Sequence, residues 1–323
     1  MKALVCGGAG YIGSHMVRAL IREGHDVLVV DDLSTGHRAA TGETELAVVN
    51  LLDESALDRV FASWKPDVVF HFAAFSVVRD SVADPLVYYR NNIAGSINLL
   101  SSMRRHGVSK LVFSSTAAVY GMPSVDRIDE SQPLQPINPY GSSKVAAERL
   151  LCEAHHAYGI RSVSFRYFNA AGADPSGGIG EAHDPETHLI PNVLRAAAGG
   201  TAIQVYGNDY ATPDGTCIRD YVHVCDLARA HLRAAQYLDD HDGAYSFNLG
   251  SGNGCSVLEV ISAVERVTSR RVDVVFSPRR EGDPDRLVAS HVLASKELSW
   301  LPTMSDIDNL VGSAWAWHLQ RNY

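Results

Sequence analysis

Tyr140 and Lys144 are the two residues in this sequence best suited to move a proton, because they stand four positions apart in the segment NPYGSSK. Asn138 is a good N-cap and Pro139 a good first helical residue, so we expect both side chains on one face of a helix's first turns. A free phenol has a pKa of about 10 and is a poor base at neutral pH. A neighbouring ammonium and a helix N-terminus both favour the phenolate, so we expect the pKa of Tyr140 to be lowered. Taken alone, this spacing often occurs by chance, and an exposed helical pair explains it better.

Hydroxyl groups at a strand end supply the partner that such a base needs. Ser114, Ser115 and Thr116 follow the apolar run Leu111–Phe113. Ligands of open parallel sheets bind outside the carboxyl ends of the strands. We therefore expect Thr116 to hold a substrate oxygen while Tyr140 moves its proton. A simple strand-end cap is the alternative for Thr116 by itself.

A glycine-rich turn near the amino terminus is typical of a phosphate-binding loop. Gly7, Gly10 and Gly13 form GxxGxxG between the apolar run Ala3–Cys6 and a helical pattern beginning near Ile12. Gly7 permits the tight turn and Gly10 lets the backbone approach a pyrophosphate. Gly13 allows close packing of helix on strand, while the helix N-terminus presents free N–H groups to an anion.

An acidic residue at the end of the next apolar run selects the nucleotide. Asp31 follows Val27–Val30 and stands 18 residues beyond Gly13. A carboxylate there accepts both ribose hydroxyls of an adenosine and repels a 2′-phosphate. The sequence thus predicts NAD rather than NADP as cofactor, although Arg38 lies close by; a solvated strand end is the alternative for Asp31.

These residues need a parallel sheet to hold them, and the first half of the chain predicts one. Short apolar runs alternate with helical segments, the pattern of a doubly wound sheet covered on both faces. The expected strands are Ala3–Cys6, Val27–Val30, Leu46–Val49, Val68–Phe72, Leu111–Phe113 and Val163–Phe165. The expected helices between them are Ile12–Glu23, Ser55–Trp64, Pro85–His106 and Pro139–Tyr158.

The alternation weakens after Asn169, which indicates a second region. Residues 172–187 are rich in Gly, Pro and acids. Further on, helical patterns appear at Asp226–Leu238 and Val257–Thr268, and a strand pattern appears at Val272–Phe276. We expect an α/β fold with a Rossmann-type, NAD-binding domain over residues 1–170 and a return segment near 217–250. Residues 171–323 would form a smaller α/β substrate domain.

Composition excludes several classes of protein. The chain has 323 residues, 46% of them hydrophobic, and a formal net charge of −9, which argues against a nucleic-acid binder. No apolar run approaches the roughly 18 residues that span a bilayer, and no signal peptide is recognisable. Five scattered cysteines without CxxC spacing indicate neither a disulfide framework nor a zinc site. We therefore expect a cytoplasmic protein with no membrane and no nucleic-acid partner.

Histidine pairs are the remaining hint of a metal. His155-His156 and the pair His183/His188 stand in helical and loop segments with no carboxylates evidently arranged around them. We interpret them as ordinary polar residues and expect no metal site.

Together, the glycine loop, the strand-end hydroxyl and the Tyr-x-x-x-Lys pair resemble the extended short-chain dehydrogenase/reductase family. The resemblance is to its UDP-glucose/UDP-galactose 4-epimerase branch and covers nearly the whole chain, from residue 7 to residue 283. The similar blocks are GGAGYIGSH, HFAAFSVVRDSV, FSSTAAVYG, NPYGSSK, RYFNAAGADPSG, HLIPNVL, GNDYATPDGTCIRDYVHV and PRREGD. The last few are specific to that branch rather than to dinucleotide binding in general. The resemblance implies a homodimer that epimerises UDP-glucose and UDP-galactose at C4 through a transient 4-keto sugar, with NAD as cofactor.

The resemblance also implies roles for individual residues. Tyr140 would be the base, Lys144 would grip the nicotinamide ribose, and Thr116 would hold the substrate oxygen. The implied NAD site consists of Gly7, Gly10, Tyr11, Ile12, Gly13, Asp31, Asp32, Leu33, Ser34, Thr35, Gly36, Leu51, Leu52, Phe72, Ala73, Ala74, Ser76, Asn91, Thr116, Tyr140, Lys144 and Phe168. The implied UDP-sugar site consists of Thr116, Tyr140, Asn169, His188, Leu189, Gln204, Val205, Tyr206, Arg219, Arg280, Asp283 and Leu287.

Four positions depart from the better-known members of the branch. Asp32 stands in place of an Asn, Leu51 in place of an Asp that reaches the adenine, and Ser76 in place of a lysine. His188 replaces an Asn that holds the UDP-sugar, and both residues donate a hydrogen bond. None of these changes touches the proton or hydride chemistry.

Three other functions remain as alternatives. A 4,6-dehydratase would need acids directly after the strand-end hydroxyl, where this chain has Ala117-Ala118. A catalytically silent NAD-binding regulator would not need Tyr140 and Lys144. A UDP-pentose or UDP-uronate 4-epimerase would share every motif above and is the main alternative. In the family, the side chain at Leu287 lies near the sugar 2-substituent, and its intermediate size predicts weak, secondary turnover of UDP-GlcNAc.

Overall fold

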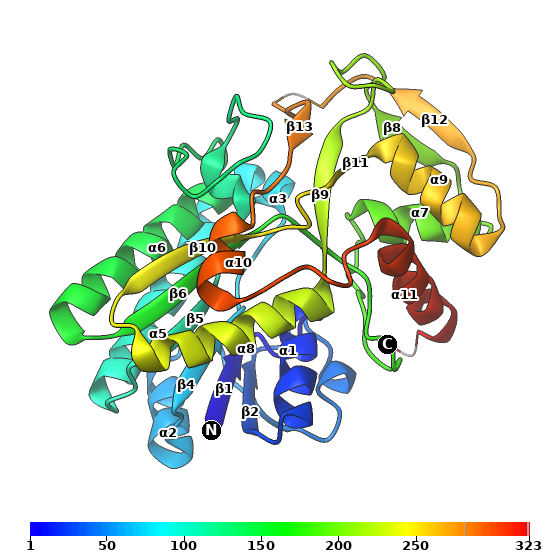
Figure 1. Ribbon diagram of the computed structural model, residues 1–323. Helices are drawn as coiled ribbons and strands as arrows, with labels where there is room; N and C mark the ends of the chain where they lie inside the picture. Colours follow the sequence, from blue (N-terminus) through cyan, green and yellow to red (C-terminus); the bar gives the residue numbers. More distant parts are fainter. Residues whose placement is uncertain (281, 322) are drawn as a thin grey trace.

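A seven-stranded, all-parallel sheet forms the centre of the computed structural model, which describes residues 1–280, 282–321 and 323 (Figure 1). Its strand order is β10-β6-β5-β4-β1-β2-β3, the order of a doubly wound Rossmann-type sheet, so the predicted fold class is confirmed. The strands are β1 (Lys2–Cys6), β2 (Asp26–Asp31), β3 (Glu45–Val48), β4 (Val68–His71), β5 (Lys110–Ser114), β6 (Arg161–Tyr167) and β10 (Ala244–Leu249). No helix within the described residues combines the length and the apolar composition that a membrane crossing requires.

Helices cover both faces of this sheet. One face carries α1 (Tyr11–Arg22), α8 (Val224–Asp240) and α10 (Val292–Leu298), and the other carries α2 (Glu54–Trp64), α5 (Gly95–Arg105) and α6 (Pro139–Tyr158). The side chains divide accordingly, because successive residues of a strand point to opposite faces. In β1, Val5 packs with the α1 and α8 side, whereas Leu4 packs with the α2, α5 and α6 side.

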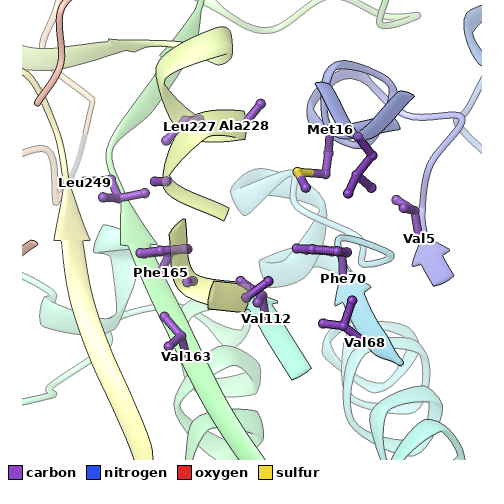
Figure 2. Packing of buried hydrophobic residues seen from close by; sticks show 14 of the residues in the cluster. Val5, Met16, Val68, Phe70, Val112, Val163, Phe165, Leu227, Ala228 and Leu249 are labelled. Carbon is purple, nitrogen blue, oxygen red and sulfur yellow. The ribbon is translucent and has the colours of Figure 1, made fainter. Parts of the chain in front are cut away.

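The core on the α1 and α8 side explains why the strands are apolar without interruption. Val5 of β1, Phe70 of β4 and Phe165 of β6 are fully buried, and Met16 of α1 and Leu227 of α8 pack in the same cluster (Figure 2). Strands buried on both faces lose the polar alternation of a half-exposed strand. The apolar runs found in the sequence are therefore the inner strands of the sheet.

The helix predicted over Pro85–His106 is not regular, and that prediction is wrong in its middle. The chain forms α4 (Pro85–Tyr89), then a π-helical turn over Arg90–Ala94, and then α5. In this turn the Asn92 side chain accepts a hydrogen bond from Phe75 N (2.9 Å) and donates one to Ser143 Oγ (3.0 Å). These contacts to two other segments favour the wider turn. Single π-helical turns of this kind often occur at functional positions.

A second group of smaller strands and helices accompanies the main sheet. The segments that connect the strands and helices of the main sheet include the short helix α3 (Val78–Ala83) and two 3₁₀ turns, η1 (Arg38–Thr41) and η3 (Ala117–Tyr120). A four-stranded sheet contains β7 (Asn169–Ala171), β9 (Ile218–His223), β11 (Gly254–Ser256) and β13 (Arg286–Leu287), and a two-stranded sheet contains β8 (Ile203–Tyr206) and β12 (Val274–Ser277). The helices packed with them are α7 (Leu189–Ala197), α9 (Val257–Thr268) and α11 (Ile307–Gln320), which lie together at the right of Figure 1.

Within the segment 217–250, only the later part returns to the central sheet. β10 pairs with β6 in parallel, and α8 packs on α1. β9 instead pairs with β7, β11 and β13, so it belongs to the four-stranded sheet. The chain thus leaves the central sheet between β6 and β7 and returns to it after β9, through α8 and β10.

Candidate active site

The glycine loop connects β1 to α1 in the geometry that a bound pyrophosphate requires. Gly7 has φ +80°, a conformation that favours glycine, and a Cβ on Gly13 would lie only 2.0 Å from the Gly7 carbonyl oxygen. Gly10 is the N-cap of α1 and offers no capping side chain. The N–H groups of the first turn therefore have no side-chain partner at the cap, so they fit an anionic ligand such as the NAD pyrophosphate. A small hollow beside the loop is lined in part by Tyr11 and Thr35.

Asp31 is fixed at the end of β2, next to this loop. Its two carboxylate oxygens accept N–H groups from Ala9 (2.9 Å) and Leu33 (2.8 Å). The side chain is buried, and burial raises its pKa. A carboxylate oxygen accepts more than one hydrogen bond, so both oxygens remain able to accept ribose hydroxyls. The carboxylate suits the role predicted for it.

The other residues predicted to bind the cofactor follow the carboxyl ends of five parallel strands, where ligands of such sheets bind. After β2 lie Asp32, Leu33, Ser34, Thr35 and Gly36; after β3 lie Leu51 and Leu52; after β4 lie Phe72, Ala73, Ala74 and Ser76; after β5 lies Thr116; and after β6 lies Phe168. Asn91 joins them from the π-helical turn. Ser34, Thr35, Leu52 and Ser76 are exposed.

Tyr140 lies in the first turn of α6, as predicted, and meets Thr116. Asn138 caps this helix by accepting Gly141 N at 2.8 Å, and Pro139 is its first residue. Burial raises the pKa of Tyr140 to about 12, and the smaller opposing effect of the nearby Thr116 hydroxyl does not offset it. The expected lowering of this pKa is therefore wrong for the protein without ligands.

The orientation of Lys144 explains that difference. Its Nζ donates to the Ser114 carbonyl oxygen at 2.7 Å and lies 4.7 Å from the centre of the Phe113 ring, but 6.0 Å from that of Tyr140. Burial also lowers the pKa of Lys144 to about 7, against a smaller opposing effect of Glu148. The ammonium thus contacts the end of β5 rather than the phenol.

Beneath the predicted residues lies a buried ion pair that the sequence reasoning missed. Arg166 of β6 donates to Glu148 of α6 at 2.6 Å, with both side chains less than 10% exposed. Ser115 Oγ donates to the same carboxylate. This pair connects the strand end that carries Thr116 to the helix that carries Tyr140. The available signal was Arg166 itself, because a charge within a buried parallel strand requires a partner.

The residues predicted to bind the diphosphate and base lie on β8, β9 and the loop before β13. Arg219 pairs with Asp283, and Arg280 stacks over the Tyr206 ring at 4.1 Å. The Tyr206 hydroxyl donates to Gln204 at 2.8 Å. These side chains offer two guanidinium groups and an aromatic face.

Val205 differs from its neighbours on β8. Its side chain is 1% exposed and belongs to the core around α7 and α9, so only its backbone could meet a ligand.

Leu287 of β13 packs in one cluster with Phe168 and with Val119, which follows the strand-end hydroxyls closely in the chain. Asn169 donates its side-chain N–H to the Asp220 carbonyl oxygen at 2.9 Å.

His188 does not stand free before α7. It is the N-cap residue, ahead of Leu189, and its Nδ1 contacts the carboxylate of Glu181. The expectation that no carboxylates surround His183 and His188 is wrong, because Glu181 and Glu186 both lie against the two imidazoles. The loop brings together residues that the sequence separates by at most seven positions.

Comparison with known proteins agrees with this geometry. The chain matches the model of the NAD dependent epimerase/dehydratase family over residues 3–250. It is 49% identical to the UDP-glucose 4-epimerase of Lacticaseibacillus casei over 320 residues, which cover 98% of this chain and 97% of that protein. It superimposes on the UDP-glucose 4-epimerase from Brucella ovis in complex with NAD with a TM-score of 0.95, at 46% identity, covering 98% of this chain and 97% of that one. For the enzyme from Bifidobacterium longum in complex with NAD⁺ and UDP, the TM-score is 0.94 at 39% identity, covering 99% of each chain.

Proposed function

Because the chain belongs to the NAD dependent epimerase/dehydratase family, we propose that it interconverts UDP-glucose and UDP-galactose by inverting C4 of the sugar, with NAD as cofactor. One observation of the structure carries the proposal: the first turn of α6, which holds Tyr140, packs against the segment that begins with Thr116 after β5, on the edge of the sheet where the glycine loop and Asp31 lie. A proton-transfer group, a hydroxyl and a dinucleotide cradle are thereby gathered at one edge.

The proton chemistry falls to Tyr140. Its oxygen takes the proton of the sugar 4-hydroxyl when C4 is oxidised and returns it when C4 is reduced on the other face. Thr116 holds the same substrate oxygen and so fixes the distance over which the proton moves. Bound NAD would supply the reversible hydride acceptor for C4, so that no net oxidation results.

Lys144 orders the strand end on which this chemistry depends. Its bond to the Ser114 carbonyl oxygen holds α6 against β5, two residues before Thr116. The ammonium has further N–H donors, and these suit the hydroxyls of the nicotinamide ribose. Its contribution to the phenolate is then that of a nearby positive charge rather than of a direct hydrogen bond.

Binding of UDP is assigned to the residues of the second sheet group. Arg219 and Arg280 offer forked N–H donors to the diphosphate, Tyr206 offers a ring face, and Asp283 offers a carboxylate for ribose hydroxyls. Arg219 and Asp283 pair with each other in this structure, so substrate would exchange that contact for its own. A site that binds the nucleotide tightly and the sugar weakly permits the 4-keto sugar to rotate between its oxidation and its reduction at C4.

The sugar preference is tested with a panel of substrates. Incubation with UDP-galactose is expected to yield UDP-glucose at a rate far above any turnover of UDP-xylose or UDP-glucuronate. Half of the residues are identical to those of UDP-glucose 4-epimerases, which favours the hexose. Faster turnover of UDP-xylose or UDP-glucuronate would favour the pentose or uronate alternative and contradict the proposal.

Leu287 sets the expectation for N-acetylated sugars. It is partly buried beside Phe168, at the point where β13 pairs with Arg219 of β9. A leucine leaves more room than a tyrosine and less than a small residue. We expect weak turnover of UDP-GlcNAc, and a rate equal to that with UDP-glucose would contradict this reading.

Three coarser features complete the proposal. We divide the chain into an NAD-binding domain over residues 1–170, joined by the return of α8 and β10, and a smaller UDP-sugar-binding domain over most of residues 171–323. The five cysteines are unpaired, which suits a cytoplasmic enzyme. We also assign a homodimer, because exposed apolar side chains concentrate on α3, α4 and α5.

A further inference from the structure

The segment between β7 and α7 gathers two carboxylates and two imidazoles that the proposed epimerisation does not use as a group. One ligand atom from each of Glu181, His183, Glu186 and His188 lies within 4.8 Å of every other. Both imidazoles turn Nδ1 toward the carboxylates. Side chains separated by at most seven positions thus converge on one point.

The spacing of these atoms is that of ligands around one small ion. Zinc–nitrogen and zinc–oxygen bonds of about 2.1 Å in a tetrahedron place neighbouring ligand atoms about 3.4 Å apart. His183 Nδ1 lies 3.1 Å from Glu181 Oε1 and 3.7 Å from Glu186 Oε1. His188 Nδ1 lies 3.7 Å from Glu186 Oε1 and also contacts Glu181. The separations fall on both sides of the tetrahedral value.

The charges at this point are compatible with a bound cation. The side chains of Glu181 and Glu186 are only 6% and 2% exposed, and burying two like charges together is costly without compensation. Among the described residues, no lysine or arginine forms an ion pair with either carboxylate. Without a metal, two protonated imidazoles balance them, because the carboxylates raise the pKa of both histidines, that of His183 to about 10. One divalent ion with two neutral imidazoles gives the same balance of charge.

We propose that Glu181, His183, Glu186 and His188 form a binding site for one divalent transition-metal ion of the zinc class. Mixed imidazole and carboxylate ligands suit Zn²⁺ or Mn²⁺, whereas Mg²⁺ and Ca²⁺ prefer oxygen ligands alone. None of these four residues takes part in the proton transfer proposed for Tyr140 and Thr116.

Its surroundings give the ion a structural task. The Ala182 carbonyl oxygen accepts His37 Nε2 at 2.7 Å, and the Glu181 carbonyl oxygen accepts the Trp317 indole N–H at 2.8 Å. The His183 ring meets Tyr11 of the glycine loop edge to face at 6.2 Å. An ion at this point would fasten the segment before α7 between the NAD-binding loop and α11.

Titration of the chelator-treated, NAD-loaded enzyme with Zn²⁺ tests the proposal. Calorimetry is expected to give one Zn²⁺ per chain with micromolar or tighter affinity, and Co²⁺ in its place should give the visible absorption of a tetrahedral centre. Mg²⁺ should bind at least tenfold more weakly. The melting temperature should rise with Zn²⁺, because an ion that binds only the folded chain stabilises it.

Two variants and a matched control separate this site from adventitious binding. Glu181→Gln and His183→Gln should each weaken Zn²⁺ binding at least tenfold and abolish the Co²⁺ absorption. The double variant His155→Gln/His156→Gln on α6 removes two imidazoles elsewhere and should bind as the parent does. The absence of stoichiometric binding in the parent enzyme would overturn the proposal, and so would binding that survives both cluster variants. Because the readout is binding and stability, failure here is independent of the epimerase activity.

Discussion

A partly buried phenol that must lose a proton is the central feature at the scale of single residues. Burial raises the pKa of Tyr140 to about 12, while Lys144 turns toward the Ser114 carbonyl oxygen. The oxidised nicotinamide ring carries a positive charge, and an opposite charge nearby favours the phenolate. We infer that the working pKa of this phenol is reached only when NAD is bound.

The pKa of Tyr140 should accordingly fall on NAD binding. Ultraviolet titration of tyrosinate, taken as the difference between the parent protein and Tyr140→Phe, should give a pKa near 12 without NAD and a lower one with it. Because the base acts as phenolate, kcat/KM of the holoenzyme should increase with pH up to that lower value. Identical titration curves with and without NAD would contradict this reading.

Residue types and spacing were sufficient to select Tyr140, Thr116 and Asp31 as candidates and to predict their places in the fold, because each follows a strand or begins a helix that the sequence marks clearly. The direction of Lys144 was not predictable, since a long side chain selects among several acceptors that only the fold supplies. The carboxylates beside His183 and His188 were missed for a related reason. Their convergence depends on the path of an irregular loop, which carries no periodic pattern.

At the scale of elements, the turn from β1 into α1 tolerates no side chain at one glycine. In Gly13→Ala the added Cβ would approach the Gly7 carbonyl oxygen to 2.0 Å, so the turn must open. Overpacking of this kind costs about 1–3 kcal/mol, and NAD affinity should fall roughly tenfold or more.

Gly312→Ala is the matched control for this substitution. Gly312 lies in α11, and a Cβ there meets no atom within 4 Å. The melting temperature should stay the same or rise, because alanine favours a helix by up to about 1 kcal/mol over glycine. Equal effects of the two substitutions on NAD affinity would contradict the role assigned to the loop.

Most elements of the central sheet could be predicted from periodicity, and α6 and α9 match the predicted bounds. The π-helical turn over Arg90–Ala94 could not, because the sequence there keeps a helical pattern without proline or glycine. The cause of the wider turn is a set of tertiary contacts, namely the hydrogen bonds of Asn92 with Phe75 and Ser143. Such contacts override local propensity.

At the scale of the whole molecule, one short stretch of the chain carries many of the exposed apolar side chains. In the part of the chain that the structure describes, six of the nineteen exposed large hydrophobic residues fall within residues 78–97. They are Val78, Val82, Leu86, Val87, Tyr89 and Ile97. Apolar side chains gathered on neighbouring elements often mark a protein interface, which supports the proposed homodimer.

Charge placed on this surface should therefore separate the subunits. Leu86 on α4 is 77% exposed, and Leu86→Asp is expected to shift the protein from dimer to monomer in sedimentation or gel filtration. Val292→Asp on α10 changes a side chain that is 69% exposed elsewhere and should leave the dimer intact. A dimer that persists in Leu86→Asp, or a parent protein that is monomeric, would exclude this interface.

In the proposed interconversion of UDP-glucose and UDP-galactose, a single phenol, that of Tyr140, carries the proton. The most direct measurement compares Tyr140→Phe with Tyr158→Phe, which removes an exposed hydroxyl at the far end of the same helix. We predict that Tyr140→Phe retains NAD but loses at least about a hundredfold in rate, the typical contribution of a general base, while Tyr158→Phe matches the parent enzyme. An undiminished rate in Tyr140→Phe would contradict the account.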